Sequence, residues 1–196
     1  MAKRIGVLAL QGDFDAHRRA LNILGVKNTD IRKSEQLEDI DGLIIPGGES
    51  TTLIKLLHAF DMVDPIREFY KNGNGIFGTC AGSILLAKEI ENSDQFRFGF
   101  IDITVVRNGY GRQVDSFEDD LNVNEFGKEP VHAVFIRAPR ITRCGAGVTT
   151  LAAAGGSSLI AKEKNILVTT FHPELTDDTR IHRYFVDTCV KESVKK

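Results

Sequence analysis

Gly75-Ile76-Phe77-Gly78-Thr79-Cys80-Ala81-Gly82 joins a short apolar segment to a run of helix-forming residues, with one residue between them. The first part predicts a buried strand over 75–79, and residues 81–90 predict a helix behind it. The pattern G-x-C-x-G is typical of a sharp strand-to-helix turn that lifts a nucleophile clear of a sheet. A helix N-terminus at that point favours a thiolate, which can attack a carbonyl carbon. A small buried cysteine between two glycines is the alternative, and this stretch alone leaves it open.

Strand-like and helical segments alternate around this turn in the first half of the chain. Asp13 is the expected N-cap of the first helix, and Gly25 is its expected stop. Continuous apolar strands separated by helices indicate a parallel sheet that is covered on both faces. The predicted strands cover 5–10, 29–32 and 42–45, and the predicted helices cover 13–24, 50–60 and 65–71.

The second half has many strand-like segments and few helical intervals, which suggests antiparallel additions to the main sheet. These segments cover 101–106, 114–122, 131–136, 148–153, 157–161 and 166–170, and a final helix is expected over 178–192. No internal repeat, low-complexity stretch or linker divides the chain. The expected fold is therefore one three-layer α/β domain over 1–196, with a mostly parallel central sheet.

Composition and charge exclude several classes of function. The chain has 196 residues, 42% of them hydrophobic, and a net charge of −2, so it has no global positive field for nucleic acid or an anionic membrane. No apolar segment reaches membrane-spanning length. The three cysteines are widely spaced and form no CxxC pair, which argues against a disulfide framework or a structural zinc site. We therefore expect a cytoplasmic protein with no metal.

His172-Pro173-Glu174 follows the apolar strand that ends near 170. In an extended segment, side chains two residues apart point to the same side, so Glu174 can bond one imidazole nitrogen of His172 while the other faces a thiol. Pro173 stiffens the segment by fixing its own φ. A loop that happens to contain His and Glu is the alternative. Together with the Cys80 turn, the segment completes a set of nucleophile, base and orienting carboxylate.

Pro46-Gly47-Gly48-Glu49-Ser50-Thr51-Thr52 lies at the C-terminal end of the third predicted strand, where open α/β sheets bind ligands. Its paired glycines allow backbone N–H groups to turn toward an anion or an oxyanion. Ser50 or Thr51 is the expected cap of the next helix. A phosphate loop is one alternative, although no Gly-Lys-Ser/Thr follows, and an ordinary strand-to-helix turn is the other.

These three segments, in this order, resemble the class I, triad-type glutamine amidotransferases. Within that family the chain is most similar to the glutaminase subunits of pyridoxal 5'-phosphate synthases. The resemblance spans about 5–185, and its most specific part is 111–118, with Arg112 and Phe117. The segments that carry it are 9–12, 46–52, 111–118, 135–139 and 172–178. It implies a flavodoxin-like fold, no cofactor, and hydrolysis of L-glutamine to L-glutamate and ammonia through a cysteine thioester.

The resemblance also implies roles for individual residues. Cys80 would be the nucleophile, His172 the general base and acid, and Glu174 the orienting carboxylate. Gln11 matches a position near the oxyanion site and the partner interface. The backbone N–H of Ala81, with one from Gly47 or Gly48, would form the oxyanion hole. The residues that match glutamine-binding positions are Gly48, Glu49, Ser50, Arg107, Ile136 and Arg137.

The charges in that set suit a free amino acid. Glu49 supplies an anion for the ammonium group of glutamine, and Arg107 and Arg137 supply cations for its carboxylate. Cys144 and Cys189 match no catalytic position.

The resemblance implies a separate synthase subunit with a (β/α)8 barrel, which receives the ammonia inside a hetero-oligomer. One alternative is a glutaminase subunit for another acceptor pathway, although the 111–118 segment speaks against it. The other is a cysteine-based redox sensor or regulatory module on the same turn. Such a protein has no need of His172 and Glu174.

Overall fold

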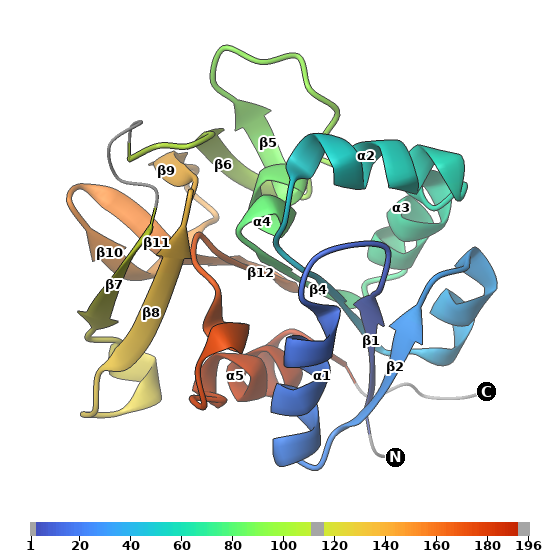
Figure 1. The fold of residues 1–196 in the computed structure, drawn as a ribbon, viewed down its shortest axis with the longest axis horizontal. Coiled ribbons are helices and arrows are strands. Elements are labelled where there is room, and N and C mark those ends of the chain that lie inside the picture. The colour runs from blue at the N-terminus through green and yellow to red at the C-terminus, as the bar shows by residue number, and fades with distance from the viewer. Residues whose placement is uncertain (1–2, 111–115, 192–196) are drawn as a thin grey trace.

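A ten-stranded sheet forms the centre of the protein (Figure 1) in a computed structural model that describes residues 3–110 and 116–191. The strand order is β2-β1-β3-β4-β12-β11-β9-β6-β5, and β10 pairs with β11. Its first five strands in this order are mutually parallel. They are β2 (Lys27–Ile31), β1 (Arg4–Leu8), β3 (Gly42–Ile45), β4 (Gly75–Thr79) and β12 (Ile166–Thr169).

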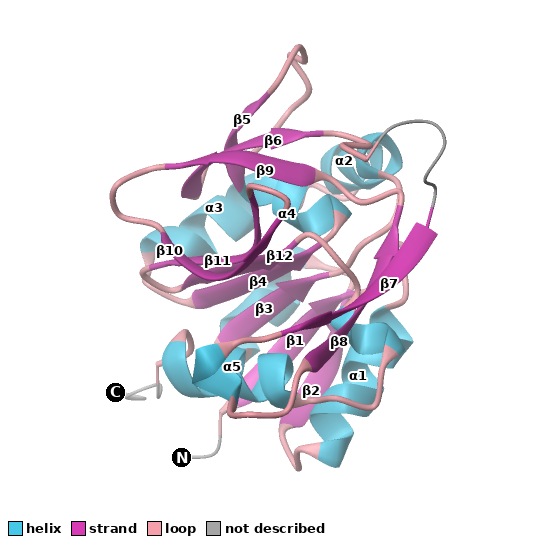
Figure 2. Ribbon diagram, turned by 90° about the vertical axis from the view of Figure 1, so that its left-hand side faces the viewer, coloured by secondary structure: helices cyan, strands magenta, loops and turns pink. Residues whose placement is uncertain are grey.

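Helices cover both faces of the parallel part, as Figure 2 shows. Every residue of β3, β4 and β12 is buried, as expected for strands covered on both faces. On one side α1 (Phe14–Ile23) and α5 (Arg180–Thr188) pack over Ile44 and Phe77. On the other side α2 (Ser50–Ala59), α3 (Val63–Lys71) and α4 (Ala81–Leu86) pack over Leu43 and Ile76. The expected three-layer architecture is present.

The second half adds mostly antiparallel strands beyond β12. Strand β11 is antiparallel to β12, β9 and β10, and β6 is antiparallel to β9, whereas β5 is parallel to β6. Strands β7 and β8 form a separate two-stranded sheet. The bounds are β5 (Ala87–Ile90), β6 (Ile101–Val106), β7 (Ser116–Leu121), β8 (Val131–Ile136), β9 (Arg140–Cys144), β10 (Thr149–Ala154) and β11 (Ser157–Glu163).

The predicted helix over 81–90 is wrong in its last four residues. Helix α4 ends at Leu86, and 87–90 form strand β5. Residues 87–90 have good intrinsic helix propensity, but pairing with β6 outweighs it. The N–H groups of Phe98 and Phe100 also donate to the carbonyls of Leu85 and Leu86, which ties the end of the helix to the following loop.

Other boundaries differ by smaller amounts. Strand β9 was not predicted, and the final helix spans 180–188 rather than 178–192, whose last residue lies outside the described part. Residues 111–115 of the specific 111–118 segment, including Arg112, also lie outside the described residues. The remainder of that segment begins β7, where Phe117 stacks on Phe135 with ring centroids 4.4 Å apart. Among the helices of residues 3–110 and 116–191, none combines the length and the hydropathy that a membrane-spanning segment needs.

The centre of the parallel sheet should carry much of the stability. Ile44 is fully buried, whereas Ile23 at the end of α1 is 67% exposed. We predict that Ile44→Ala lowers the free energy of unfolding by about 2–5 kcal/mol because it leaves a cavity. Ile23→Ala is the matched control and should change it by less than about 0.5 kcal/mol. Urea unfolding measures both, and equal effects would contradict this assignment of the core.

Candidate active site

Cys80 occupies a strained backbone position between β4 and α4. Its φ is 46° and its ψ is −105°, a conformation that L-residues rarely adopt. A Cβ on Gly82 would lie 2.2 Å from the carbonyl oxygen of Ile45, and one on Gly78 would lie 2.7 Å from the backbone of Gly82. Strand, turn and helix therefore pack too closely for any side chain at these two glycines. The expected turn is present, and steric crowding explains why glycine occupies positions 78 and 82.

The pairing of β12 with β4 brings the histidine segment to Cys80. The two strands are parallel and in register, with Thr169 beside Thr79, so the segments that follow them leave the sheet together. His172 Nδ1 lies 2.8 Å from Glu174 Oε1, and the His172 imidazole is within hydrogen-bonding reach of the Cys80 thiol. The three side chains expected to act together are brought together, although Cys80 and His172 come from different halves of the chain.

The conformation of that segment is not the predicted extended one. Residues Pro173–Leu175 form a short 3₁₀ turn that begins directly after His172. The N–H of Leu175 donates to the carbonyl of His172 at 3.3 Å, and the N–H of His172 donates to the carbonyl of Val134 in β8 at 2.9 Å. Glu174 therefore lies against the imidazole because of this turn, which is anchored on β8. Alternation of side chains along a strand does not place it there.

Burial and hydrogen bonding act in opposite directions on the charges of this group. Burial acts to lower the pKa of His172, but hydrogen bonds with Cys80 and Glu174 outweigh it and raise the pKa to about 10. Burial acts to raise the pKa of Glu174, but its interactions with His17 and His172 outweigh burial and hold that pKa below its ordinary value. An imidazolium facing an ionised carboxylate is therefore the stable arrangement at neutral pH.

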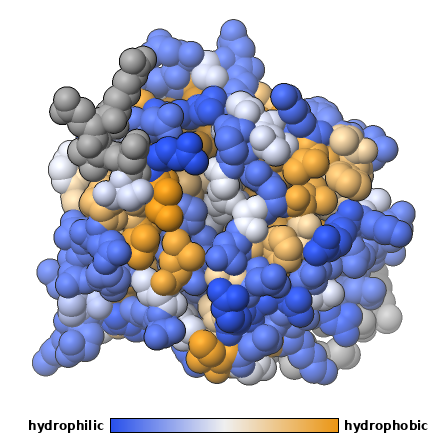
Figure 3. Space-filling model, in the orientation of Figure 1, coloured by the Kyte–Doolittle hydropathy of each residue, from blue (hydrophilic) through white to orange (hydrophobic). Residues whose placement is uncertain are grey.

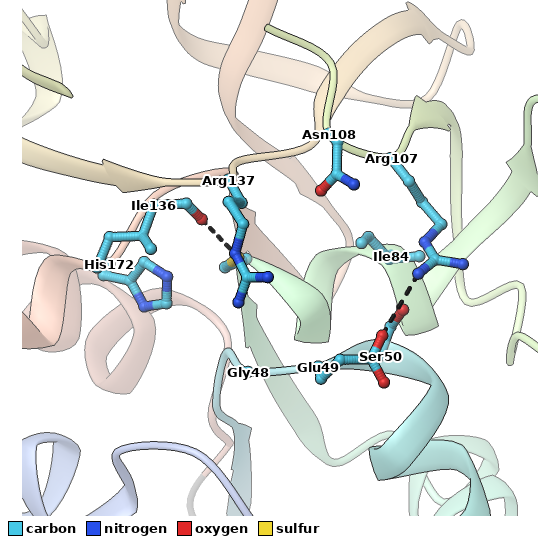
Figure 4. Close-up of a pocket in the computed structure, with 10 residues that line it drawn as sticks. Gly48, Glu49, Ser50, Ile84, Arg107, Asn108, Ile136, Arg137 and His172 are labelled. Carbon is cyan, nitrogen blue, oxygen red and sulfur yellow. Dashed lines mark hydrogen bonds and ion pairs between the residues drawn. The ribbon is translucent and has the colours of Figure 1, made fainter. Parts of the chain in front are cut away.

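A cavity of about 220 Å³ opens beside Cys80 and His172 (Figure 4). Two further residues, Ile84 on α4 and Asn108 after β6, line it and were not predicted. Asn108 directly follows the predicted Arg107, and Ile84 lies two residues beyond the cysteine turn, so their positions beside predicted residues were the available signal. The six residues expected to bind glutamine all line this one cavity: Gly48, Glu49, Ser50, Arg107, Ile136 and Arg137.

Glu49 has a structural task as well as a place in the cavity. Its carboxylate caps α2 by accepting the N–H of Thr52 at 2.7 Å, so the prediction that Ser50 or Thr51 caps this helix is wrong. The longer Glu49 side chain reaches back to the helix, and it also accepts the hydroxyl of Thr51. This hydroxyl and the Thr52 N–H lower the pKa of Glu49 to about 2 against the effect of burial. Arg107 lies 3.4 Å from the same carboxylate.

The glycine loop presents one engaged N–H group and one that is better placed for a ligand. Gly47 donates its N–H to Thr79 Oγ1 at 3.0 Å. Gly48, with φ 137°, lies against Gln11, whose Nε2 donates to the carbonyl of Glu49 at 2.9 Å. Ala81 begins α4, where the N–H has no acceptor within its own helix. Of the two glycines considered for an oxyanion hole, the geometry favours Gly48.

A buried polar group behind the triad was not found from the sequence. His17 on α1 and His182 on α5 are fully buried, and their Nδ1 and Nε2 atoms lie 2.9 Å apart. His17 Nε2 lies 3.5 Å from Glu174 Oε2. From the sequence, His17 is only a histidine on the apolar face of a predicted amphipathic helix, and no neighbouring residue indicates its contacts with His182 and Glu174. Within 3–110 and 116–191, no cluster of three or more His, Cys, Asp or Glu side chains could hold a metal ion.

Comparison with known proteins gives consistent matches over nearly the whole chain. The family model described as SNO glutamine amidotransferase matches residues 7–191. The pyridoxal 5'-phosphate synthase subunit PdxT of Carboxydothermus hydrogenoformans is 56% identical over 188 residues, which are 96% of this chain and 98% of that protein. The subunit of the same name from Thermotoga maritima is 52% identical over 184 residues, 94% of this chain and 98% of that one.

Solved structures agree with the sequence matches. A crystal structure of a glutamine amidotransferase superposes with a TM-score of 0.88 and 48% identity, covering 94% of this chain and 98% of that chain. The matched residues include all of the segments that meet at Cys80. The chain is therefore an enzyme, a glutamine amidotransferase, and it belongs to the SNO glutamine amidotransferase family.

Proposed function

We propose that the protein hydrolyses L-glutamine to L-glutamate and ammonia in the cavity beside Cys80, and that the ammonia supplies a partner synthase for pyridoxal 5'-phosphate. The observation that carries the first part is the thiol of Cys80 on a strained turn, within reach of an imidazole that is itself bonded to a buried carboxylate. The second part rests on the relatives, which are named as subunits of pyridoxal 5'-phosphate synthase.

The first half of the reaction forms a thioester. The Cys80 thiolate attacks the side-chain amide carbon of glutamine, and the C=O electron pair moves to oxygen. The N–H groups of Ala81 and Gly48 meet this oxyanion, and such a donor lowers a barrier by about 3 kcal/mol. The imidazolium of His172 then gives its proton to the amide nitrogen, and the C–N bond breaks. Ammonia leaves, and a glutamyl group remains on sulfur.

The second half releases glutamate. Neutral His172 takes a proton from water as the water oxygen attacks the thioester carbon. Collapse of the second tetrahedral species breaks the C–S bond and restores both the thiolate and the imidazolium. Glu174 touches His172 throughout and keeps the imidazole in the tautomer and orientation that both halves need.

The charges in the cavity suit the free amino acid end of the substrate. Glu49 is ionised and faces Arg107, so an arriving ammonium and carboxylate can each exchange for one member of that pair. Arg137, which also lines the cavity, supplies a second cation for the carboxylate. Ser50 and the carbonyl of Ile136 offer polar atoms between these charges and Cys80, whose Sγ lies 3.9 Å from that carbonyl.

The partner is a synthase subunit with a (β/α)8 barrel, joined to this chain in a hetero-oligomer that passes ammonia internally. Exposed apolar side chains near the triad support docking there, because Ile136 is 37% exposed and Leu175 is 42% exposed. The face of the molecule shown in Figure 3 is mostly hydrophilic, with a few apolar patches. We infer that Gln11 senses that partner, which is supported by its position on the loop beside Gly48. We expect glutamine hydrolysis to be weak until the partner binds.

Two further assignments belong to this proposal. The whole chain, 1–196, acts as one glutaminase domain, which is supported by a single sheet that takes strands from both halves. The protein works in the cytoplasm, which is supported by three free cysteines in the described residues. The chemistry above uses side chains and backbone alone, so no cofactor is assigned.

Removal of the Cys80 thiol tests the nucleophile. We predict that Cys80→Ser, assayed as glutamate release in the complex with the synthase, lowers kcat by more than about a thousandfold, as expected when a triad loses its nucleophile. Cys144→Ser makes the same chemical change at a partly exposed thiol outside the cavity and should leave kcat unchanged. Wild-type turnover by Cys80→Ser would contradict the mechanism.

The raised pKa of His172 predicts a pH-dependent contribution to stability. Because its pKa is about 10 when folded and has an ordinary value of 6.5, the stabilisation is fully present below pH 6.5 and is lost as the pH rises through 10. His172→Gln should therefore lower the free energy of unfolding more at pH 6 than at pH 10. Urea unfolding at the two pH values measures this difference. Exposed His58→Gln is the control, and an equal cost of His172→Gln at both values would refute the charge assignment.

Arg137 should act in binding and not in chemistry. We predict that Arg137→Ala raises KM for glutamine by about 10- to 100-fold with little change in kcat. This factor corresponds to the binding free energy of one hydrogen bond to a charged group. Arg183→Ala, at an exposed position on α5, is the matched control. Steady-state kinetics in the complex measure both parameters. A lost kcat at unchanged KM would assign Arg137 a different role.

A further inference from the structure

One buried imidazole contacts both halves of the active site from behind. His17 Nε2 lies 3.5 Å from Glu174 Oε2 and 3.3 Å from Thr79 Oγ1. The same Thr79 oxygen accepts the N–H of Gly47 at 3.0 Å. His17 therefore connects the carboxylate that orients His172 with the glycine loop that faces the substrate. All of these side chains are buried beneath the cavity and none except His172 lines it.

The two oxygens of Glu174 differ in their partners. Oε1 bonds His172 at 2.8 Å, whereas Oε2 is buried and has no hydrogen-bond partner within the described residues. The contact that the structure gives Oε2 is the one to His17 Nε2. An ionised carboxylate oxygen in a buried site is costly without a donor. The orientation of Glu174 therefore depends on what faces Oε2.

The hydrogen positions follow from this contact. His17 Nε2 faces two oxygens, Thr79 Oγ1 at 3.3 Å and Glu174 Oε2 at 3.5 Å. Because an ionised carboxylate only accepts, we assign the hydrogen of the ring to Nε2, which leaves Nδ1 bare. His17 Nδ1 then accepts the Nε2–H of His182 at 2.9 Å, which leaves His182 Nδ1 as a bare acceptor, and that atom is buried without a partner. Burial lowers the pKa of His17, and it lowers the pKa of His182 to about 3. Both rings are neutral at physiological pH.

We propose that His17 is a positioning residue for the triad, which holds Glu174 Oε2 so that Oε1 stays on His172 and holds Thr79 beneath Gly47. This proposal rests on the glutaminase function proposed above. Without the Nε2–H, the Glu174 carboxylate can turn away from His172 toward another donor. His172 then loses part of the interaction that keeps it protonated beside Cys80.

A simpler alternative is that His17 only fills space between α1 and the sheet. Its ring lies edge-on to Phe77 with centroids 6.2 Å apart and lies 5.2 Å from the ring of His182. A space-filling role requires bulk, whereas a positioning role requires a donor at the place of Nε2. His17→Leu keeps apolar bulk without a donor, and His17→Gln places an amide N–H near the position of Nε2. The two variants therefore separate the alternatives.

The first measurement is glutamate release by the complex with the synthase. We expect His17→Leu to lower kcat by about 10- to 100-fold, the usual cost of removing a group that orients a reacting side chain, with KM changed by less than about threefold. His17→Gln should recover most of kcat. Leu21→Ala, equally buried on the same helix, loosens α1 without touching Glu174 or Thr79 and should retain wild-type kcat in its folded fraction.

The second measurement needs neither glutamine nor the partner. Iodoacetamide alkylates thiolates, so the ratio of the Cys80 alkylation rate at pH 7 to that at pH 10 reports how well His172 supports the thiolate. Peptide mass spectrometry resolves Cys80 from Cys144, which serves as the reference within each sample. We expect His17→Leu to lower the ratio for Cys80 by about tenfold, which corresponds to the weakening of one hydrogen bond to a charged group. Leu21→Ala, measured where it remains folded, should have the wild-type ratio, because Leu21 is not one of the residues that contact Glu174 or Thr79.

The third measurement asks whether His17 acts through Glu174. In a Glu174→Gln background, His17→Leu should change the alkylation ratio by less than about twofold, because residues that act through one another are not additive. Full additivity would overturn the proposal, and so would wild-type kcat and ratio in His17→Leu. A wild-type complex that releases no glutamate would instead contradict the proposed function, whereas the alkylation ratios would still test the positioning role.

Discussion

The active site depends on a turn that the backbone makes at a single residue. Cys80 joins β4 to α4 with φ 46°, and the chain can cross there only because positions 78 and 82 carry no side chain. The crossing lies at the C-terminal edge of the parallel strands (Figure 1), where open α/β sheets bind ligands. The strands on either side of β4 are β3 and β12, and the segments that follow them carry the glycine loop and His172. The loop after β3 brings Gly47 against Cys80 and His172 so closely that a Cβ there would lie 2.4 Å from the imidazole.

The active site also depends on a carboxylate, that of Glu174, which is buried inside the protein. The Glu174 side chain is 1% exposed. Moving an isolated charge from water to such a buried position has an unfavourable desolvation free energy unless other groups interact with it. The imidazolium of His172 on one oxygen and the neutral ring of His17 near the other make the charge tolerable. Replacement of the whole group by apolar side chains could produce an equally stable core. We interpret the retained charge as preorganisation, because it fixes the base before substrate arrives.

Much of the framework was predictable because it is local. Strands over 42–45, 75–79, 101–106 and 131–136 have the predicted bounds, since each is a short apolar or alternating run between clear breakers. The cysteine turn was visible in five residues. The six residues assigned to the cavity came from motifs and family resemblance, and they do line one cavity.

Most of the wrong or missing predictions have one physical cause, which is contact between segments that are distant in sequence. Residues 87–90 have helix propensity but pair with β6. The cap of α2 is Glu49, whose side chain is long enough to reach the N–H of Thr52, although shorter side chains are more common at caps. His17 meets His182 across 165 residues of sequence, and nothing near either one marks the contact. A pattern confined to one helix predicts a buried face. It does not predict which polar group from another segment that face will meet.

The central claim is that the Cys80 sulfur forms a bond to the substrate. The most direct measurement is to mix the complex with isotopically labelled glutamine, stop the reaction in acid during turnover, and map the label by peptide mass spectrometry. The account predicts a labelled glutamyl group on the peptide that contains Cys80 and none on those with Cys144 or Cys189. Glutamate release without any labelled Cys80 peptide, or label on another cysteine, would contradict it.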